Sequence, residues 1–341
     1  MAISAAKAEL LREWAGKRGY VVAWGDGAIL DEIRREMGRR AELGEFDGEF
    51  WAQTLEPAFK YGERSHIADV RTVVLVAVPR PAHLVRFQAG SWSTEAILPP
   101  TYVWYERVQQ DIFADLRAIL GPGPCLTPLQ TPLKAVAVRL GLAAYGRNKL
   151  AYVPGLGSYH QLVGFATDAS LGPGPTAGRD TPALCPECTH CTACREACPA
   201  GAIGEDRILL HAERCLTLAN EAEGPWPAWL FPAAHHCLVG CMRCQEVCPQ
   251  NVGLLHWETV TEVFSPEETA TILGEGAVAE EGRDRVDVRW EQVKAKVASI
   301  GLPGYEVIIG RNLRALLRAP LESLSEMEKA RRILQAVNPP A

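Results

Sequence analysis

The sequence lacks the long apolar stretches that would place it in a membrane. Its longest clean apolar run is Val73 to Val78, far shorter than the roughly 20 residues that span a bilayer. The first eighteen residues leave no room for the apolar core of an export signal because they carry Lys7, Glu9, Arg12, Glu13, Lys17 and Arg18. We therefore expect a cytoplasmic protein without membrane contact.

An excess of positive charge is also absent. The 341 residues carry a net charge of −6, so the whole molecule is not a general nucleic-acid binder. Local basic groups occur at Arg34, Arg35, Arg39 and Arg40 and again at Arg311, Arg314 and Arg318. Because each group falls on one predicted helix, a solvated helix face explains it better than an RNA contact.

Cysteine is abundant, but a disulfide framework is not expected. Ten of the 11 cysteines lie between Cys185 and Cys248, in a chain without a secretory signal. Such crowding in a reducing compartment is typical of metal binding.

Periodicity predicts helices and strands in alternation before residue 170. Helices are expected at 5–18, 29–43, 102–120 and 132–140, and strands at 20–24, 70–78 and 159–166. A Gly/Pro-rich joint follows at 171–182, and the chain beyond about residue 254 has helical, charged character. The predicted organisation is an α/β catalytic domain at 1–170, a cysteine-rich domain at 171–254 and a helical C-terminal region at 255–341.

Two cysteine motifs repeat one spacing. The first is C-x2-C-x2-C-x3-C-P, from Cys188 through Cys191 and Cys194 to Cys198. The second has Cys241, Cys244 and Cys248 before a proline, with Cys215 and Cys237 upstream. This spacing is typical of bacterial ferredoxins with two 4Fe-4S clusters, in which the fourth cysteine of each run binds the other cluster.

The crossover predicts two ligand sets. One cluster takes Cys188, Cys191, Cys194 and Cys248, and the other takes Cys198, Cys241, Cys244 and one upstream thiolate. Cys215 and Cys237 both fit that last place by spacing. Structural zinc is the alternative, but zinc sites need neither a third cysteine at x2 nor a repeated Cys-Pro. Cys125 and Cys185 are expected to be inert thiols, with Cys185 a spare ligand as the alternative.

Beyond the cysteines, the sequence resembles the epoxyqueuosine reductases, cobalamin-dependent iron–sulfur enzymes related to reductive dehalogenases. Residues 141–150, GLAAYGRNKL, are similar to the family's G-L-G-W-x-G-K-x-x-L segment. Residues 157–164, GSYHQLVG, are similar to its G-S-x-F-F-L-G-E stretch, and residues 213–215, ERC, to its R-R-C. Gly240-Cys241-Met-Arg-Cys244 resembles G-C-D-D-C. The likeness covers about 128–251.

The resemblance implies an α+β fold: a nitroreductase-like cobalamin-binding domain, a two-cluster ferredoxin-like domain and a helical tail. It makes Cys215 the preferred ligand of the second cluster. It also implies a reductive oxidoreductase that receives electrons from an external donor such as ferredoxin or flavodoxin. The substrate would be a small molecule or a modified nucleoside.

The sequence departs from the family where a proton is delivered. The family's D-S-A-P-L segment, whose Asp is the proton donor, corresponds to residues 129–133, LQTPL. Leu129 at the acidic position cannot deliver a proton, so either the substrate and donor differ or the alignment is slipped.

Replacement acids are expected among Tyr145, Tyr159 and His160, for which ordinary core packing is the alternative. The family-like segments also suggest cofactor contacts, at Arg147, Lys149, Gly157 and Ser158. For Arg147 and Lys149, solvated surface charge is the alternative.

Three functions follow. The leading one is a cobalamin and 4Fe-4S reductase with an unassigned substrate. The second is reduction of epoxyqueuosine to queuosine in tRNA, a partner the sequence does not favour. The third is an electron-transfer protein that serves a partner enzyme, against which the 170 residues before the cysteines argue.

Overall fold

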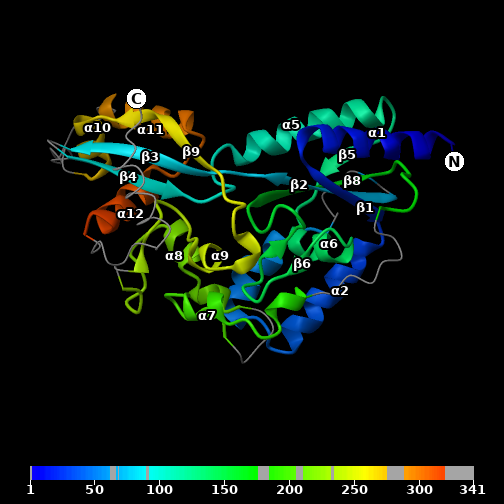
Figure 1. The fold of residues 1–341 in the computed structure, drawn as a ribbon, viewed down its shortest axis with the longest axis horizontal. Helices are drawn as coiled ribbons and strands as arrows, with labels where there is room; N and C mark the ends of the chain where they lie inside the picture. Colours follow the sequence, from blue (N-terminus) through cyan, green and yellow to red (C-terminus); the bar gives the residue numbers. More distant parts are fainter. Residues whose placement is uncertain are drawn as a thin grey trace.

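The computed structural model describes residues 2–61, 67, 69–89, 92–175, 184–204, 210–231, 234–274 and 288–318. Its elements fall into two lobes with the cysteine-rich loops between them (Figure 1). Among the described helices, none has the length and apolar character needed to cross a membrane.

The first lobe is built on a four-stranded antiparallel sheet in the order β1-β2-β8-β5. Its strands are β1 (Val21–Asp26), β2 (Thr72–Pro79), β8 (His160–Thr167) and β5 (Leu126–Pro128). Seven of the eight residues of β2 are buried. The strand is one continuous apolar run because helices cover both faces of its sheet, so side chains that point to either face are buried.

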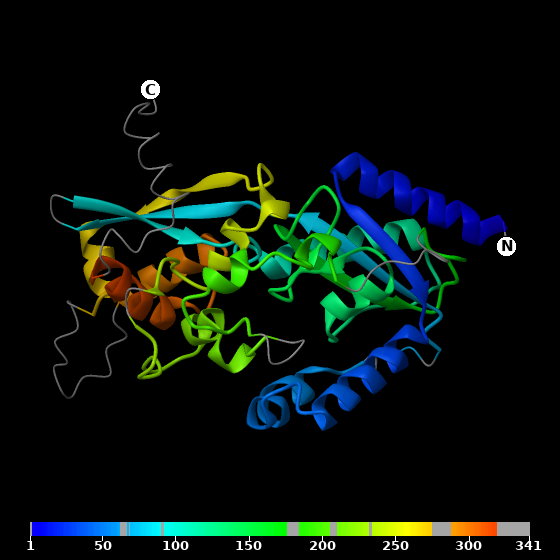
Figure 2. The same ribbon diagram turned by 60° about the horizontal axis from the view of Figure 1, so that its bottom comes forward.

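Alternate residues of β2 enter different cores. Val74 and Val76 pack with α1 (Ala2–Arg18) and α5 (Tyr105–Leu120), whereas Val73 and Leu75 pack with α2 (Ile29–Glu42) and α6 (Leu133–Arg139). Helices α1 and α2 accordingly lie on opposite sides of the sheet (Figure 2). The predicted helices and strands of residues 5–166 are present, with shifts of a few residues at their ends.

The remaining elements of this lobe are short. They are α3 (Gly48–Phe50), the π-helix η1 (Trp51–Leu55), α4 (Glu56–Ala58) and the ribbon of β6 (Ala144–Tyr145) and β7 (Ala151–Tyr152).

The second lobe joins residues that are far apart in the sequence. Its sheet, in the order β4-β3-β9, pairs β3 (Ala82–Ala89) with β4 (Trp92–Leu98) antiparallel and with β9 (Trp257–Phe264) parallel. Helices α10 (Pro266–Ile272), α11 (Val288–Ser299) and α12 (Glu306–Arg318) complete it. Phe87 and Phe264 stack in its core with ring centroids 4.8 Å apart.

This second lobe differs from the predicted organisation. Residues 82–103 share one core with residues 264–313, so the regions 1–170 and 255–341 are not separate packing units. The region from 255 onwards also begins with a strand rather than a helix. Local periodicity could not reveal a parallel pair whose strands are joined by so long a crossover.

The cysteine-rich loops contain only short helices. These are η2 (Pro186–Cys188), α7 (Ala193–Glu196), η3 (Ala212–Arg214), α8 (Leu216–Glu221), α9 (Arg243–Glu246) and η5 (Pro249–Asn251). The two cysteine runs lie side by side, because α7 packs against α9.

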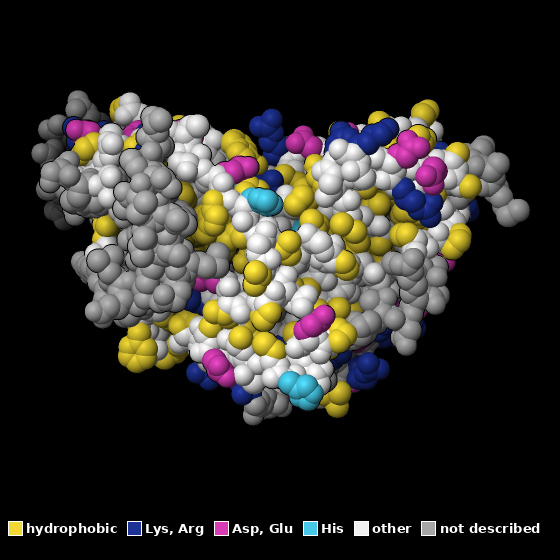
Figure 3. Space-filling model, in the orientation of Figure 1, with side chains coloured by type: hydrophobic (Ala, Val, Ile, Leu, Met, Phe, Trp, Pro, Cys, Tyr) yellow, Lys and Arg dark blue, Asp and Glu magenta, His cyan; other side chains and the backbone are white. Residues whose placement is uncertain are grey.

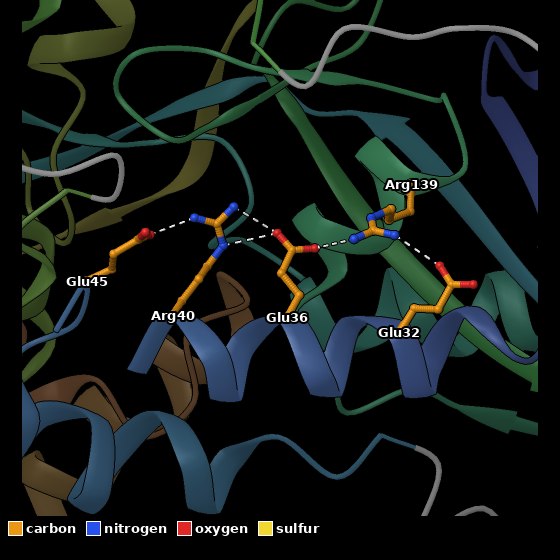
Figure 4. Close-up of polar contacts among 5 residues, drawn as sticks. All are labelled: Glu32, Glu36, Arg40, Glu45 and Arg139. Atoms are coloured by element: carbon orange, nitrogen blue, oxygen red, sulfur yellow. Dashed lines mark hydrogen bonds and ion pairs between the residues drawn. The ribbon is translucent and has the colours of Figure 1, made fainter. Parts of the chain in front are cut away.

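An ionic network fixes α2 against α6 (Figure 4). Arg40 contacts Glu36 and Glu45 at 2.9 and 2.6 Å, and Arg139 of α6 contacts Glu36 and Glu32 at 2.5 and 3.0 Å. Burial alone would raise the pKa of Glu36, but hydrogen bonds from Arg40 and Arg139 outweigh it and lower that pKa.

Replacing Glu36 by Gln should therefore lower the free energy of unfolding at neutral pH by about 1 kcal/mol, allowing for solvent screening. Since the folded pKa lies below the unfolded one, the contribution is complete above the unfolded pKa and disappears as the pH falls through the folded one. Urea denaturation at several pH values measures the difference from wild type. Glu9→Gln, in an exposed pair with Arg12, is the control. A difference that persists in acid would contradict this account.

Truncating Phe87 to Ala should cost about 3–5 kcal/mol, because it empties a fully buried site between the two parts of the second lobe. The urea midpoint of the anaerobic protein measures the loss. Phe231→Ala, at a residue 75% exposed, should leave the midpoint unchanged. Equal effects of the two variants would show that residues 82–98 do not share the second core.

Candidate iron–sulfur and cavity site

Four cysteines of the first predicted set lie together. Burial raises the pKa of the Cys194 thiol, and charge on its neighbours raises it further, those neighbours being Cys188, Cys248 and Cys191. Repulsion of this kind acts only between thiolates that are close. The chain therefore brings the end of the second cysteine run to the first three cysteines of the first run.

The second set converges in the same way. Burial raises the pKa of Cys241 well above its ordinary value, and the thiolates that add to it are Cys244, Cys215 and Cys198. The pKa of Cys244 rises to about 12, again through burial first and then Cys215 and Cys198. Cys215, and not Cys237, is thus the upstream cysteine that lies close to this group.

Cys237 has other neighbours. Its side chain is fully buried in an apolar cluster with Met242, Tyr159 and Leu84. Cys125 is exposed and Cys185 is buried. Burial raises the pKa of Cys185 to about 12, with Cys188 as the next cause.

Thiolates at these two groups need cationic partners because burial and mutual repulsion oppose their charge. Among the residues that the structure describes, no three Cys, His, Asp or Glu side chains close around a single metal ion. Two sets of four cysteines, with N–H donors beside the sulfurs, fit the donor set of iron–sulfur clusters. One such donor is the amide of Ala202, 3.3 Å from Cys198 Sγ.

The segment at 144–152 holds the cysteine loops in place. The Arg147 guanidinium donates hydrogen bonds to the carbonyls of Cys191, Cys188 and Thr189, at 2.8, 2.6 and 3.3 Å. Asn148, which is 2% exposed, donates to the Cys244 carbonyl at 3.3 Å. Side chains of the first lobe therefore contact both cysteine runs.

Asn148 and Tyr152 also contact the thiols. The Asn148 amide donates to Tyr152 Oη at 3.0 Å and hydrogen-bonds the Cys244 thiolate. The Tyr152 hydroxyl hydrogen-bonds Cys248, and burial followed by this contact raises the pKa of Tyr152. Hydrogen bonds to cluster sulfurs are one determinant of reduction potential. Neither residue was predictable as a thiol contact, although Asn148 lies in the family-like segment 141–150.

A second contact lies at residues 157–159. Ser158 N donates to Asn251 Oδ1 at 2.9 Å, and Ser158 Oγ lies 3.0 Å from Gln245 Oε1. Gly157 has a φ of +57°, and a Cβ there would clash with Asn251, so glycine is needed for this close approach.

Beside the cysteine groups lies a cavity of about 410 Å³. The residues that line it are Thr101, Tyr105, Thr131, Leu133, Lys134, Leu150, Ala151, Ser158, His160, Gln161 and Leu162. Buried polar atoms of three lining residues have no hydrogen-bond partner in the described chain: Thr131 Oγ1, His160 Nδ1 and Gln161 Oε1. The lining thus combines apolar side chains with hydroxyl, amide and imidazole groups, which fits a ligand with polar groups.

Of the candidate acids, only His160 lines this cavity. Burial lowers its pKa to about 4, so the imidazole is neutral at pH 7. The Tyr159 hydroxyl donates to the Gln245 carbonyl at 3.2 Å. Tyr145 lies near the α2 network, and burial raises its pKa to about 12.

The four residues expected to contact a cofactor lie in different places. Ser158 lines the cavity, whereas Gly157 and Arg147 contact the cysteine loops as described above. The Lys149 ammonium lies 5.9 Å from the centre of the Tyr145 ring. Leu129 is buried in the core beneath Gly164. The roles of all these residues stay predictions.

The arginines considered for RNA are largely engaged within the chain. Arg311 donates to the carbonyls of Ala222, Gly224 and Ala219, and Arg314 to that of Leu273. On the face shown in Figure 3, basic side chains are scattered among acidic ones rather than gathered in a patch.

Comparison with known proteins supports the cluster region directly. Residues 187–251 match the family model of a 4Fe-4S double cluster binding domain. The epoxyqueuosine reductase of Pseudomonas aeruginosa is 31% identical over 186 residues, 54% of this chain and 48% of that protein. The Bacillus subtilis enzyme is 33% identical over 120 residues, 35% of this chain and 29% of that protein. The chain thus spans half or less of the length of these curated relatives.

Structural similarity to known proteins covers more of the chain than sequence similarity does. A solved epoxyqueuosine reductase from Bacillus subtilis aligns with a TM-score of 0.64 at 21% identity, covering 91% of this chain and 80% of that one. The Streptococcus thermophilus enzyme aligns at 0.63 with 18% identity and the same coverage. The predicted resemblance and the α+β fold are therefore confirmed.

Arg147→Lys should loosen the first cysteine run, because lysine cannot donate to several carbonyls in a fixed fork. Loss of one charge-assisted hydrogen bond, about 1.4 kcal/mol, predicts a roughly tenfold faster release of iron to a chelator. Bleaching of the cluster absorbance under anaerobic conditions measures the rate. The exposed Arg35→Lys serves as the control, and equal rates in both variants would show that the Arg147 contacts do not retain iron.

Proposed function

We propose that this chain is a reductase with two 4Fe-4S clusters and a cobalamin, related to epoxyqueuosine reductase and with an unassigned substrate. The observation that carries the proposal is the position of the two four-thiol groups beside a cavity with a partly polar lining. Ser158, which lines that cavity, donates a hydrogen bond at 3.0 Å to Oε1 of Gln245, the residue after Cys244.

The proposed ligands of one cluster are Cys188, Cys191, Cys194 and Cys248, and those of the other are Cys198, Cys215, Cys241 and Cys244. Their mutual proximity in the structure supports this division. It also supports Cys215 over Cys237, because Cys237 is enclosed by apolar side chains.

When bound, the clusters would transfer single electrons, and the cobalamin, once reduced, would act as a strong reductant. The chain's own residues position and insulate these groups. Arg147 fixes the loop at 188–191, Asn148 donates to the Cys244 thiolate, and Tyr152 hydrogen-bonds Cys248. An external ferredoxin or flavodoxin is the proposed electron donor.

The cavity is the proposed corrinoid and substrate site. Its polar lining, Thr131, His160, Gln161 and Ser158, suits the amide groups that a corrinoid carries. A volume of about 410 Å³ is at the lower end for a drug-sized ligand, so a corrinoid would extend through the open mouth.

The second candidate is reduction of epoxyqueuosine in tRNA. The specific observation that favours it is the shared fold with an epoxyqueuosine reductase solved with an epoxyqueuosine-modified tRNA stem loop. Queuosine content of tRNA after deletion of the gene tests it, in a host without a second reductase. Unchanged queuosine would remove this candidate and leave the leading proposal intact.

The cluster assignment predicts a distinct outcome for two cysteine variants. Wild type purified anaerobically should contain about eight iron and eight sulfide per chain. Cys215→Ala should lose about half, whereas Cys237→Ala should keep the full content. The reverse pattern would assign the ligand to Cys237, and zinc in place of iron would contradict both clusters.

Cobalamin binding is tested separately. Protein reconstituted anaerobically with cobalamin should retain one corrinoid per chain through gel filtration. Gln161→Leu, which removes a polar side chain from the lining, should retain less, and Lys17→Gln, at an exposed residue of α1, should match wild type. Consistent failure of wild type to retain corrinoid would leave an electron-transfer protein as the better description.

A further inference from the structure

The two cysteine runs share one backbone conformation at matching positions. Thr192 follows Cys191 and directly precedes α7, with φ −116° and ψ −1°. Met242 follows Cys241 and directly precedes α9, with φ −117° and ψ −4°. In each run the residue lies between two cysteines of the same proposed ligand set, so the two loops can be compared amide by amide.

The amides of these two residues have different partners. The Met242 N–H donates a hydrogen bond to Nε2 of His236 at 3.1 Å. Among the described residues, none accepts a hydrogen bond from the Thr192 N–H. Pro186 precedes Thr192 by six residues, as His236 precedes Met242, and its side chain has no hydrogen-bonding atom. The second loop thus contains an acceptor that the first loop lacks.

The hydrogen bond defines the state of this imidazole. A backbone N–H only donates, so Nε2 of His236 accepts, and the ring is neutral with its proton on Nδ1. His236 is 1% exposed and Met242 is fully buried. Burial also lowers the pKa of His236 well below its ordinary value. The imidazole is therefore an acceptor at neutral pH, in a place that is closed to solvent.

A backbone amide between two cluster ligands affects the cluster through hydrogen bonding. An N–H group that donates to a cluster sulfur stabilises the reduced state, which carries more negative charge, and so raises the reduction potential. An amide that donates to an imidazole is not available to a sulfur. A buried amide without a partner is costly, so an amide freed from His236 would favour another acceptor. The acceptors nearest in the sequence are the thiolates of Cys241 and Cys244.

We propose that His236 is a positioning residue of the second cluster, which holds the Met242 amide away from the sulfurs and so lowers the reduction potential of that cluster. The inference rests on the proposed function, because it requires the cluster to be present. It extends that function from the identity of the ligands to a residue that sets the reducing power of one cluster.

The location of the second cluster gives this effect a purpose. Cys244 is followed by Gln245, whose Oε1 accepts a hydrogen bond from Ser158 in the lining of the cavity. A cluster with a lower potential is a stronger reductant. The His236 contact therefore increases the driving force for transfer of an electron toward a ligand in the cavity, and the external donor replaces that electron.

The test is a redox titration of anaerobic, cluster-loaded protein, followed by electron paramagnetic resonance. His236→Leu removes the acceptor, His236→Gln keeps an acceptor oxygen, and His256→Leu makes the same change at an exposed histidine. One of the two cluster potentials should rise in His236→Leu, by about 59 mV for a tenfold change in the one-electron equilibrium. His236→Gln and His256→Leu should keep the wild-type potentials.

A double variant identifies the cluster that responds. Cys215→Ala is expected to keep the first cluster alone, so its single potential belongs to that cluster. Adding His236→Leu to Cys215→Ala should leave this potential unchanged. A rise in the double variant would overturn the proposal, because the effect would then not be confined to the second cluster.

The other outcomes separate this inference from the proposed function. Unchanged or lowered potentials in His236→Leu would overturn the role of His236. If His236→Leu loses iron, His236→Gln should restore both the iron content and the wild-type potentials. A His236→Gln protein as altered as His236→Leu would show that the acceptor is not what matters. Wild-type protein without iron and sulfide would instead contradict the function on which the inference rests.

Discussion

Eight partly or fully buried cysteine thiols lie in two adjacent groups, and the rest of the structure depends on how their charge is compensated. Burial disfavours each thiolate, and each thiolate disfavours its neighbours. Iron relieves both costs at once, because a coordinating thiol is deprotonated outright.

The loops cannot hold themselves in this arrangement, since they contain only short helices. Side chains of the first lobe hold the loops in place by donating hydrogen bonds to backbone carbonyls of both cysteine runs. Arg147 and Asn148 do so from the turn between β6 and β7, and the segment at 157–159 packs against residues 245–251. The same turns border the cavity, so the elements that fix the thiols also position the proposed reaction chamber. Figure 1 shows α9 beside β6 at about the same level, with α7 below α9.

Much of this could be predicted from the sequence, for identifiable reasons. Cysteine spacing predicts a cluster because the geometry of a cubane imposes it locally. Strand β2 was predictable because an unbroken apolar run suits a strand covered on both faces. By contrast, β3 and β9 pair across more than 150 residues, a contact that local patterns do not encode. Tyr152 was not predictable for a related reason: a single tyrosine is ordinary until the fold places its hydroxyl beside Asn148 and Cys248.

The central claim is that two iron–sulfur clusters lie next to each other beside the cavity, and electron paramagnetic resonance tests it most directly. Anaerobic protein reduced with dithionite should show a broadened spectrum of two spin-coupled 4Fe-4S clusters, because their ligand sets are interleaved. A spectrum without iron–sulfur signals, in protein that contains zinc and no acid-labile sulfide, would contradict the account.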